Sequence, residues 1–300
     1  MKIPWNRIPV IALLAVLLSF NLQAQEDTSA DSTGLPGDNF SLAGALELFK
    51  KAESLEGFEK ALNTEDNDVN NLDLNQDGQI DYVRVIDRMD GDAHAIVLQV
   101  PVNASEAQDI AVIEIEKDGA ESATLQILGD EDIYGQTVIA EPFEEDGIQK
   151  DGRHGPAMHL APAYIVVNVW GWPSVRYIYR PAYVVYVSPW RWGVYPTWWR
   201  PYRPRPWGYY HARVRPYRTR YHVVTTHRVV RAHNVYSGHR THSTVVKSRT
   251  VTHVNKNGRR GGKVQATKTT KSTTVHGRRG GSVTKQQSTT KVKGGQRGRH

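Results

Sequence analysis

Residues 73–86 read Asp73-Leu-Asn-Gln-Asp-Gly-Gln-Ile-Asp-Tyr-Val-Arg-Val-Ile86, a polar loop that runs into a β-branched, aromatic strand pattern. Side-chain oxygens stand at positions 1, 3, 5 and 9 of the loop. Gly78 stands at position 6, where a loop around an ion turns sharply and only glycine adopts positive φ without strain. The pattern predicts a Ca²⁺ site, because Ca²⁺ takes six to eight oxygen ligands. The expected ligands are Asp73, Asn75, Asp77, the carbonyl of Gln79, and Asp81.

The loop is not an EF-hand, because position 12 is Arg84 where an EF-hand needs a bidentate Glu. It resembles the calcium loops of FG-GAP and VCBS repeats, in which the loop lies in a β-hairpin and the ninth-position Asp completes the site. That resemblance covers nine residues and implies no propeller. The competing interpretation is an Asx-rich turn that binds no ion.

The segment 40–150 predicts an α+β domain. Leu42, Leu46 and Phe49 keep helical spacing behind an N-cap Ser41, and Ser54 caps a second helix or a second half of the same one. Strand patterns cover 80–88, 94–102, 110–116 and 123–128, with a last strand or edge at 137–140. In the third pattern, Ile113 and Ile115 stand on the face opposite Val112, Glu114 and Glu116. Asp-Gly turns at 90–91 and 118–119 predict an antiparallel meander, with helices on one face and water on the other.

Charge divides the chain at Asp151. All 31 acidic residues lie at or before it, so residues 25–151 carry a net charge of −24 and residues 152–300 carry +29. Like-charge blocks of this size are typical of solvated interaction segments. The expected organisation is a signal peptide (1–24), an acidic flexible linker (25–39), the α+β domain (40–150), a linker (151–163), an aromatic module (164–210) and a basic low-complexity tail (211–300).

The N-terminus predicts export. Lys2 and Arg7 precede an apolar run over 8–20 that is short for a membrane span and typical of a signal peptide, with Ala24 at the expected cleavage site. The chain has no cysteine, which excludes disulfides, a lipoprotein anchor and thiol catalysis. An exported domain of this kind depends on its core, on bound metal, or on both.

The aromatic module joins tryptophan, tyrosine, proline and arginine, a combination that suits a membrane interface, sugar rings or nucleobases. The alternative is that these rings pack on the first domain or on one another. The tail has few apolar residues, so we expect it to be largely disordered. Its Gly-Arg-Arg-Gly-Gly boxes at 258–262 and 277–281 resemble RGG segments, but an exported chain does not meet cytoplasmic nucleic acid. The tail cations expected to bind anionic polymers are Arg259, Arg260, Lys263, Arg278, Arg279, Lys291, Lys293, Arg297 and Arg299.

No catalytic motif is present, and the carboxylates show no acid/base spacing. The six histidines between 211 and 242 show no repeated i, i+4 spacing, so the sequence predicts no specific metal site there. The acidic domain, over roughly residues 40–145, resembles a set of uncharacterised exported proteins of Bacteroidetes-type bacteria, on the run 69–85 and on Ile127-Leu-Gly-Asp-Glu-Asp-Ile-Tyr-Gly135. That resemblance implies an envelope location and little else.

The function that we expect is that of an exported, non-enzymatic envelope protein. Its tail would bind lipopolysaccharide, acidic polysaccharide or extracellular DNA, and its location would be the periplasm, the outer membrane or the medium. One alternative is a structural protein that self-associates through contacts between acidic domain and basic tail. A third is a Ca²⁺-dependent hydrolase.

Overall fold

The computed structural model describes residues 32–145, 164–247, 250, 264–276 and 282–294. The described part begins with a 3-10 turn, η1 (Pro36–Asn39), followed by helices α2 (Leu42–Lys51) and α3 (Leu55–Leu62). Both expected N-caps are confirmed, because Ser41 Oγ accepts a bond from Gly44 N and Ser54 Oγ accepts one from Gly57 N, each at 3.0 Å. The helices are two separate elements. The expected signal peptide lies outside the described residues.

An antiparallel sheet follows, in the order β1-β2-β3-β4-β5-β6 with β7 also paired to β5. The consecutive pairing confirms the expected meander, and the fold is α+β. Gly91 adopts φ +59° in the two-residue turn between β1 and β2, where Asp-Gly predicted a hairpin. The strands are β1 (Arg84–Asp90), β2 (Ala93–Pro101), β3 (Ala107–Gly119), β4 (Ser122–Gly129), β5 (Val138–Glu145), β6 (Tyr164–Val166) and β7 (Tyr221–Val224).

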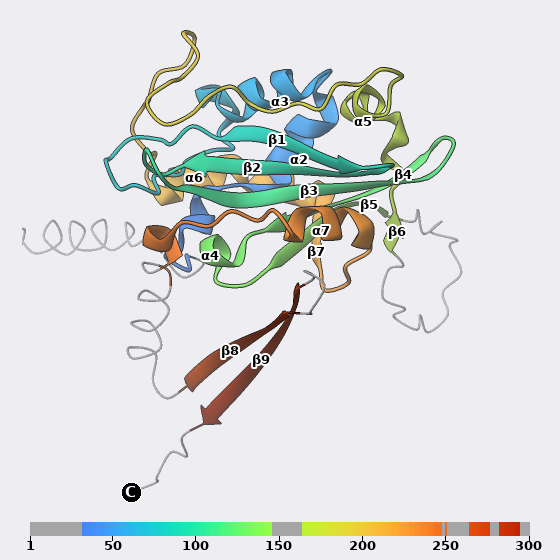
Figure 1. The fold of residues 1–300 in the computed structure, drawn as a ribbon. Coiled ribbons are helices and arrows are strands. Elements are labelled where there is room, and N and C mark those ends of the chain that lie inside the picture. Colours follow the sequence, from blue (N-terminus) through green and yellow to red (C-terminus); the bar gives the residue numbers. More distant parts are fainter. Residues whose placement is uncertain (1–31, 146–163, 248–249, 251–263, 277–281, 295–300) are drawn as a thin grey trace, which may run out of the picture. The chain divides into compact units, whose positions relative to one another are not determined.

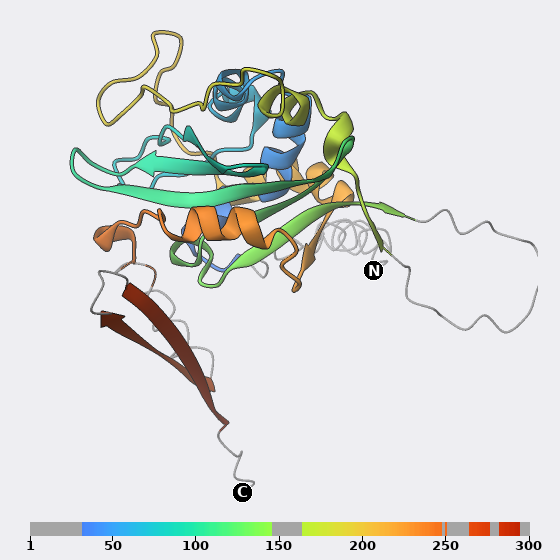
Figure 2. The ribbon, with the colours of Figure 1, turned by 45° about the vertical axis from the view of Figure 1, so that its right-hand side comes forward.

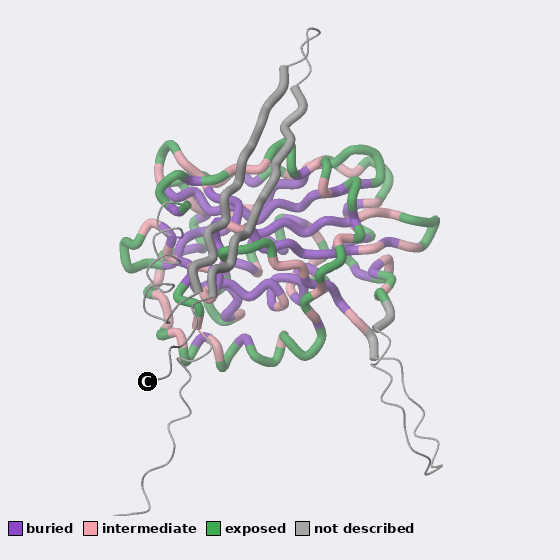
Figure 3. The backbone as a smooth tube through the Cα atoms, turned by 90° about the horizontal axis from the view of Figure 1, so that it is seen from below, coloured by how far each residue is buried: buried purple, intermediate pink, exposed green. Residues whose placement is uncertain are grey.

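One face of the sheet packs on the N-terminal helices. Ile113 and Ile115 of β3 join Phe49 and Phe58 in the main apolar core, all fully buried. Phe49 and Phe58 meet edge to face with ring centroids 5.2 Å apart. Figure 3 shows the resulting buried strands in purple.

The other face is not open to water, which corrects our expectation of one wet face. Helix α7 (Val230–Ser237) contacts β1, β2 and β3 on the side opposite α3 (Figures 1 and 2). A second apolar cluster joins Tyr236 of α7 to Val97 and Val112. Glu114, which the alternation correctly placed opposite Ile113, is therefore fully buried. Polar alternation predicted the face but not its cover.

The aromatic module packs on the acidic domain, as the alternative interpretation held. Its elements include η3 (Val169–Gly171) and α5 (Pro173–Ile178), and α5 contacts α2. The buried Glu59 carboxylate accepts bonds from Ser188 Oγ at 3.0 Å and from Tyr186 OH at 3.4 Å. Part of the module stays exposed, notably Trp192 and Trp198.

The first part of the expected tail, residues 211–247, is folded rather than disordered. It contains the end of α6 (Trp207–Val214), η4 (Arg215–Arg220), β7 and α7. Tyr221 and Val246 belong to the main apolar core, so this segment is part of the same packed structure as the acidic domain. The boundary expected at Tyr210 does not separate a folded part from an unfolded one.

Further along, strands β8 (Val264–His276) and β9 (Ser282–Gly294) pair as an antiparallel hairpin. One face of this ladder has register positions occupied by Lys271, Lys285, Lys291 and Lys293. Directly paired residues share a face, and residues two apart along a strand share a face as well. Lys268 occupies the other face. No helix among the described residues is long and apolar enough to cross a bilayer.

Candidate functional site

Short-range hydrogen bonds order the loop 73–81. The Asp73 carboxylate accepts bonds from Asp77 N at 3.1 Å and from Gly78 N at 3.0 Å, while Asn75 Oδ1 accepts one from Asp77 N at 2.8 Å. Gly78 has φ +81°, the left-handed conformation that the sequence predicted. The loop leads into β1 as expected. These bonds are those of Asx turns.

Asp81 differs from the other loop residues because it is buried, whereas Asp77 and Gln79 are exposed. Its carboxylate accepts a bond from Leu74 N at 2.5 Å. Burial, with the nearby charges of Asp73 and Asp77, raises the pKa of Asp81 to about 7. A bound cation would offset the cost of burying the charged Asp81 carboxylate. The loop donors are all oxygens, which is the ligand type that Ca²⁺ prefers. The three loop carboxylates do not, however, bring ligand atoms within 4.8 Å of one another.

The expected polymer-binding cations fall mostly outside the described residues. This holds for Arg259, Arg260, Lys263, Arg278, Arg279, Arg297 and Arg299. Lys291 and Lys293 lie in β9, two register positions apart on one face of the hairpin.

A second site lies on the sheet face beneath α7. Glu114 of β3, Gln126 of β4 and Glu141 of β5 form a buried polar row across three neighbouring strands, with exposures of 0%, 0% and 2%. Gln126 Nε2 donates to Glu141 Oε2 at 2.7 Å, and Gln126 Oε1 accepts from Arg228 N at 2.7 Å. The segment 222–233 covers this row and supplies its partners.

Two histidines converge on Glu114. His227 Nε2 lies 2.6 Å from Glu114 Oε2, and His233 Nδ1 lies 2.8 Å from Glu114 Oε1. Their rings meet edge to face, with centroids 4.5 Å apart. The hydrogen bond to Glu114 raises the pKa of His233 above its ordinary value, against the opposing effect of burial. Among the described residues this is the one group of three His, Asp or Glu with ligand atoms all within 4.8 Å.

Sequence reasoning missed this group. Glu114 is 113 residues from His227 and 119 from His233, so no local spacing connects them. His227 precedes α7 and His233 lies in it. The two histidines are six residues apart and therefore lack the i, i+4 spacing that marks a metal pair on one helix. The sequence offered one signal for Glu114, which is that this glutamate follows the apolar residues Val112 and Ile113 on a predicted strand.

Arginines of the basic half pair with carboxylates of the acidic domain. Arg240 is the most densely paired, with Nε 2.6 Å from Asp130 Oδ2 and Nη2 3.0 Å from Asp132 Oδ2. Asp130 and Asp132 are both buried. The other pairs across the two halves join Arg205 and Arg213 to Asp68, Arg205 to Glu65, Arg220 to Glu47, Arg228 to Glu141, Arg231 to Glu116, Arg240 to Glu131 and Lys247 to Asp132.

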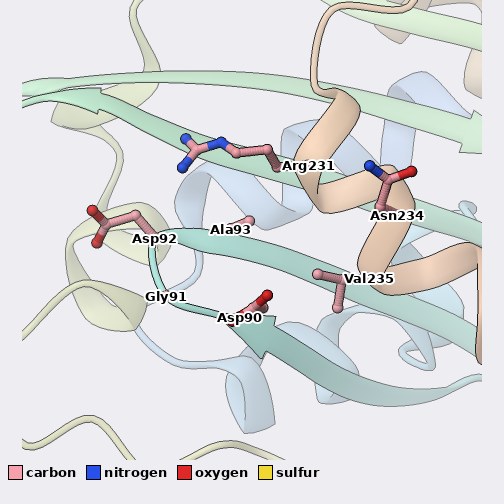
Figure 4. Close-up of a pocket in the computed structure, with 7 residues that line it drawn as sticks. All are labelled: Asp90, Gly91, Asp92, Ala93, Arg231, Asn234 and Val235. Atoms are coloured by element: carbon pink, nitrogen blue, oxygen red, sulfur yellow. The ribbon is translucent and has the colours of Figure 1, made fainter.

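A hollow of about 480 Å³ lies between the β1–β2 turn and α7 (Figure 4). The turn contributes Asp90, Gly91, Asp92 and Ala93, and α7 contributes Arg231, Asn234 and Val235. The cation of this hollow, Arg231, already pairs with Glu116 at 3.0 Å. The lining brings together no set of catalytic groups.

Comparison with protein-family models, with curated proteins and with solved structures finds no match to this chain.

Proposed function

We propose that the chain is an exported, non-enzymatic protein of the bacterial cell envelope that binds anionic polymers through its C-terminal segment. The observation that carries this proposal is the division of the cations into two sets. Seven of the nine lysines and arginines between 205 and 247 form ion pairs with carboxylates of the acidic domain. Thirteen more follow Thr250, where the sequence contains no Asp or Glu.

The second set suits polymers of phosphate or carboxylate groups. Lysines and arginines that neutralise such polymers release condensed counterions, so the affinity falls steeply with salt and depends little on polymer sequence. Four lysines of this set hold register positions on one face of the β8–β9 ladder. Lipopolysaccharide, acidic polysaccharide and extracellular DNA all present the required anionic groups.

Two further parts of the proposal rest on separate observations. The loop 73–81 would bind Ca²⁺ and stabilise the acidic domain, which is supported by its oxygen-bearing side chains and the buried Asp81. The exposed Trp192 and Trp198 would give the module a contact with a membrane interface, where indole rings concentrate.

Self-association through acidic and basic segments is the weaker alternative. Residues 205–247 and the acidic domain form such ion pairs within one chain. The groups in these pairs are therefore not available to bind a second copy.

The test compares the full chain with a chain that ends at Thr250, in a salt titration against one DNA duplex and one lipopolysaccharide. We expect the shorter chain to lose most of its affinity and most of its salt dependence. Equal binding by both chains would refute the proposal. Cell fractionation, with the protein found in the cytoplasm, would refute its envelope location.

A further inference from the structure

Glu114 has different partners from the buried carboxylates that form ion pairs with arginines of residues 205–247. Glu47, Asp68, Asp130, Asp132 and Glu141 each pair with at least one arginine. Within the described residues, Glu114 receives two imidazoles and no ion pair from arginine or lysine. Arginine neutralises a carboxylate but does not bind metal, whereas imidazole is a common metal ligand.

We propose that Glu114, His227 and His233 form a binding site for a divalent transition-metal ion of the zinc class. The ligand atoms are one oxygen of Glu114, Nε2 of His227 and Nδ1 of His233, which already face one another. Two imidazoles and one carboxylate form a donor set that suits zinc-class ions, whereas Ca²⁺ and Mg²⁺ prefer oxygen alone.

The geometry needs only a small adjustment. With metal–ligand bonds of about 2.0–2.1 Å, the ligand atoms of a tetrahedral site lie about 3.3 Å apart. The distances from Glu114 to His227 and His233 are 2.6 and 2.8 Å, so the two imidazoles would withdraw by about 0.7 and 0.5 Å. Side-chain exposures of 23% for His227 and 39% for His233 leave room for that movement.

The surroundings hold Glu114 in place while leaving one side open. Its cross-strand neighbour on β2 is Ala95, a small residue, and its neighbour on β4 is Gln126, which is hydrogen-bonded to the covering segment. Three protein ligands with a partly exposed side leave a fourth position for water or another small donor.

Coordination replaces the present hydrogen bonds without any redox change. Each neutral imidazole keeps one proton, which moves to His227 Nδ1 and to His233 Nε2, and the freed lone pair binds the metal. An imidazole that is protonated beforehand releases one proton to solvent. Because the ligands come from β3 and from the segment that covers it, the metal would tie the two halves of the chain together.

The first experiment titrates the full chain with ZnCl2 by calorimetry, with His227→Asn, His233→Asn and, as a matched control, the exposed His239→Asn. We expect one equivalent of zinc, with at least a tenfold loss of affinity in each site variant and no loss in the control. The same equivalent should raise Tm in the wild type and in the control only. Equal affinities in all four proteins would overturn the proposal.

The second experiment keeps the wild-type chain, so it does not depend on the folding of a variant. Diethyl pyrocarbonate modifies accessible imidazoles, and peptide mass mapping locates the modified residues. We expect Zn²⁺ to protect His227 and His233 at least several-fold while His239 and His242 react as before. Equal modification with and without Zn²⁺ would contradict the site.

Discussion

Glu114 and His227 lie 2.6 Å apart between Oε2 and Nε2, although 113 residues separate them in the chain. Glu114 belongs to the acidic half and His227 to the basic half. Their contact, together with the arginine pairs on the same domain, shows that the abrupt change of charge along the sequence is a complementarity within one fold. The acidic domain supplies buried carboxylates, and the segment 205–247 supplies partners for several of them.

Arg240 should be the most sensitive of these partners. Arg240→Met leaves Asp130 and Asp132, both buried, without their guanidinium, and we expect a loss of about 3–5 kcal/mol in the free energy of unfolding. The control is Arg231→Met, since Arg231 is 58% exposed and pairs with the partly exposed Glu116. Urea unfolding should show a loss below about 1 kcal/mol for the control. Equal losses of unfolding free energy in the two variants would contradict the special role of Arg240 in pairing buried carboxylates.

The two halves should remain together when the chain is cut. A protease site placed between Asp151 and Gly152 lies outside the described residues and divides the acidic from the basic half. At 1 M NaCl the Debye length is about 3 Å and exposed ion pairs are weak. Trp172, Val175 and Ile178 are buried in the main apolar core, so we expect both pieces to co-elute in size-exclusion chromatography at that salt. Separation without denaturant would show that salt-sensitive contacts alone join them.

Asp109 should make stability depend on pH. It is fully buried, accepts bonds from Gln99 Nε2 and Thr241 N, and burial raises its pKa to about 6. An acid whose pKa is higher in the folded chain than in the unfolded chain binds its proton more tightly when folded, so its contribution to stability falls as pH rises from about 4 to above 6.

The measurement compares the free energies of unfolding of the wild type and Asp109→Asn at pH 4.5 and pH 7. We expect the wild type to lose about 2 kcal/mol relative to this variant over that interval. As a control, the variant Asp90→Asn, at an exposed position, should show the same change in free energy of unfolding between the two pH values as the wild type. A constant difference between wild type and Asp109→Asn would show that Asp109 does not titrate in this range.

The loop 73–81 should respond to Ca²⁺ at millimolar concentration. Its three carboxylates and lack of a bidentate Glu predict a Kd of about 10⁻⁴–10⁻³ M. Ca²⁺ at ten times Kd should add about 1.4 kcal/mol of stability and raise Tm by a few degrees, whereas Mg²⁺ should act less. Asp73→Asn should reduce the shift and the exposed Asp66→Asn should keep it. The same Tm in chelator and in Ca²⁺ would contradict the Ca²⁺ site and favour the interpretation of the loop as an Asx-rich turn that binds no ion.

Local patterns predicted the elements well. Ser41 and Ser54 identified the starts of two helices, and the alternation around Ile113 identified a strand and its two faces. These features depend on neighbours within a few residues, so a single sequence contains them.

The cover of the second sheet face could not be predicted, because it depends on contacts more than a hundred residues apart. Glu114 reads as a solvated strand residue until His227 and His233 are placed over it. Composition likewise does not separate Trp198, which is 44% exposed, from Trp199, which is 6% exposed. Both stand in the same aromatic run and both rings lie near Tyr82, with centroids 6.4 Å away for Trp198 and 5.1 Å away for Trp199. Trp199 also meets the ring of Tyr195, at 4.7 Å between centroids.

The division of the cations into two sets is tested most directly with two matched variants of the full chain. One carries Arg259→Gln, Arg260→Gln, Arg278→Gln and Arg279→Gln, and the other carries Arg176→Gln, Arg191→Gln, Arg200→Gln and Arg203→Gln, at exposed positions of the aromatic module. Each removes four charges. In a salt titration against one DNA duplex, the first variant should reduce the slope of log K against log salt by up to about 3.6, and the second should leave it unchanged. An unchanged slope in the first variant, or an equal loss in the second, would contradict polymer binding by the C-terminal segment and place it in the aromatic module or nowhere in the chain.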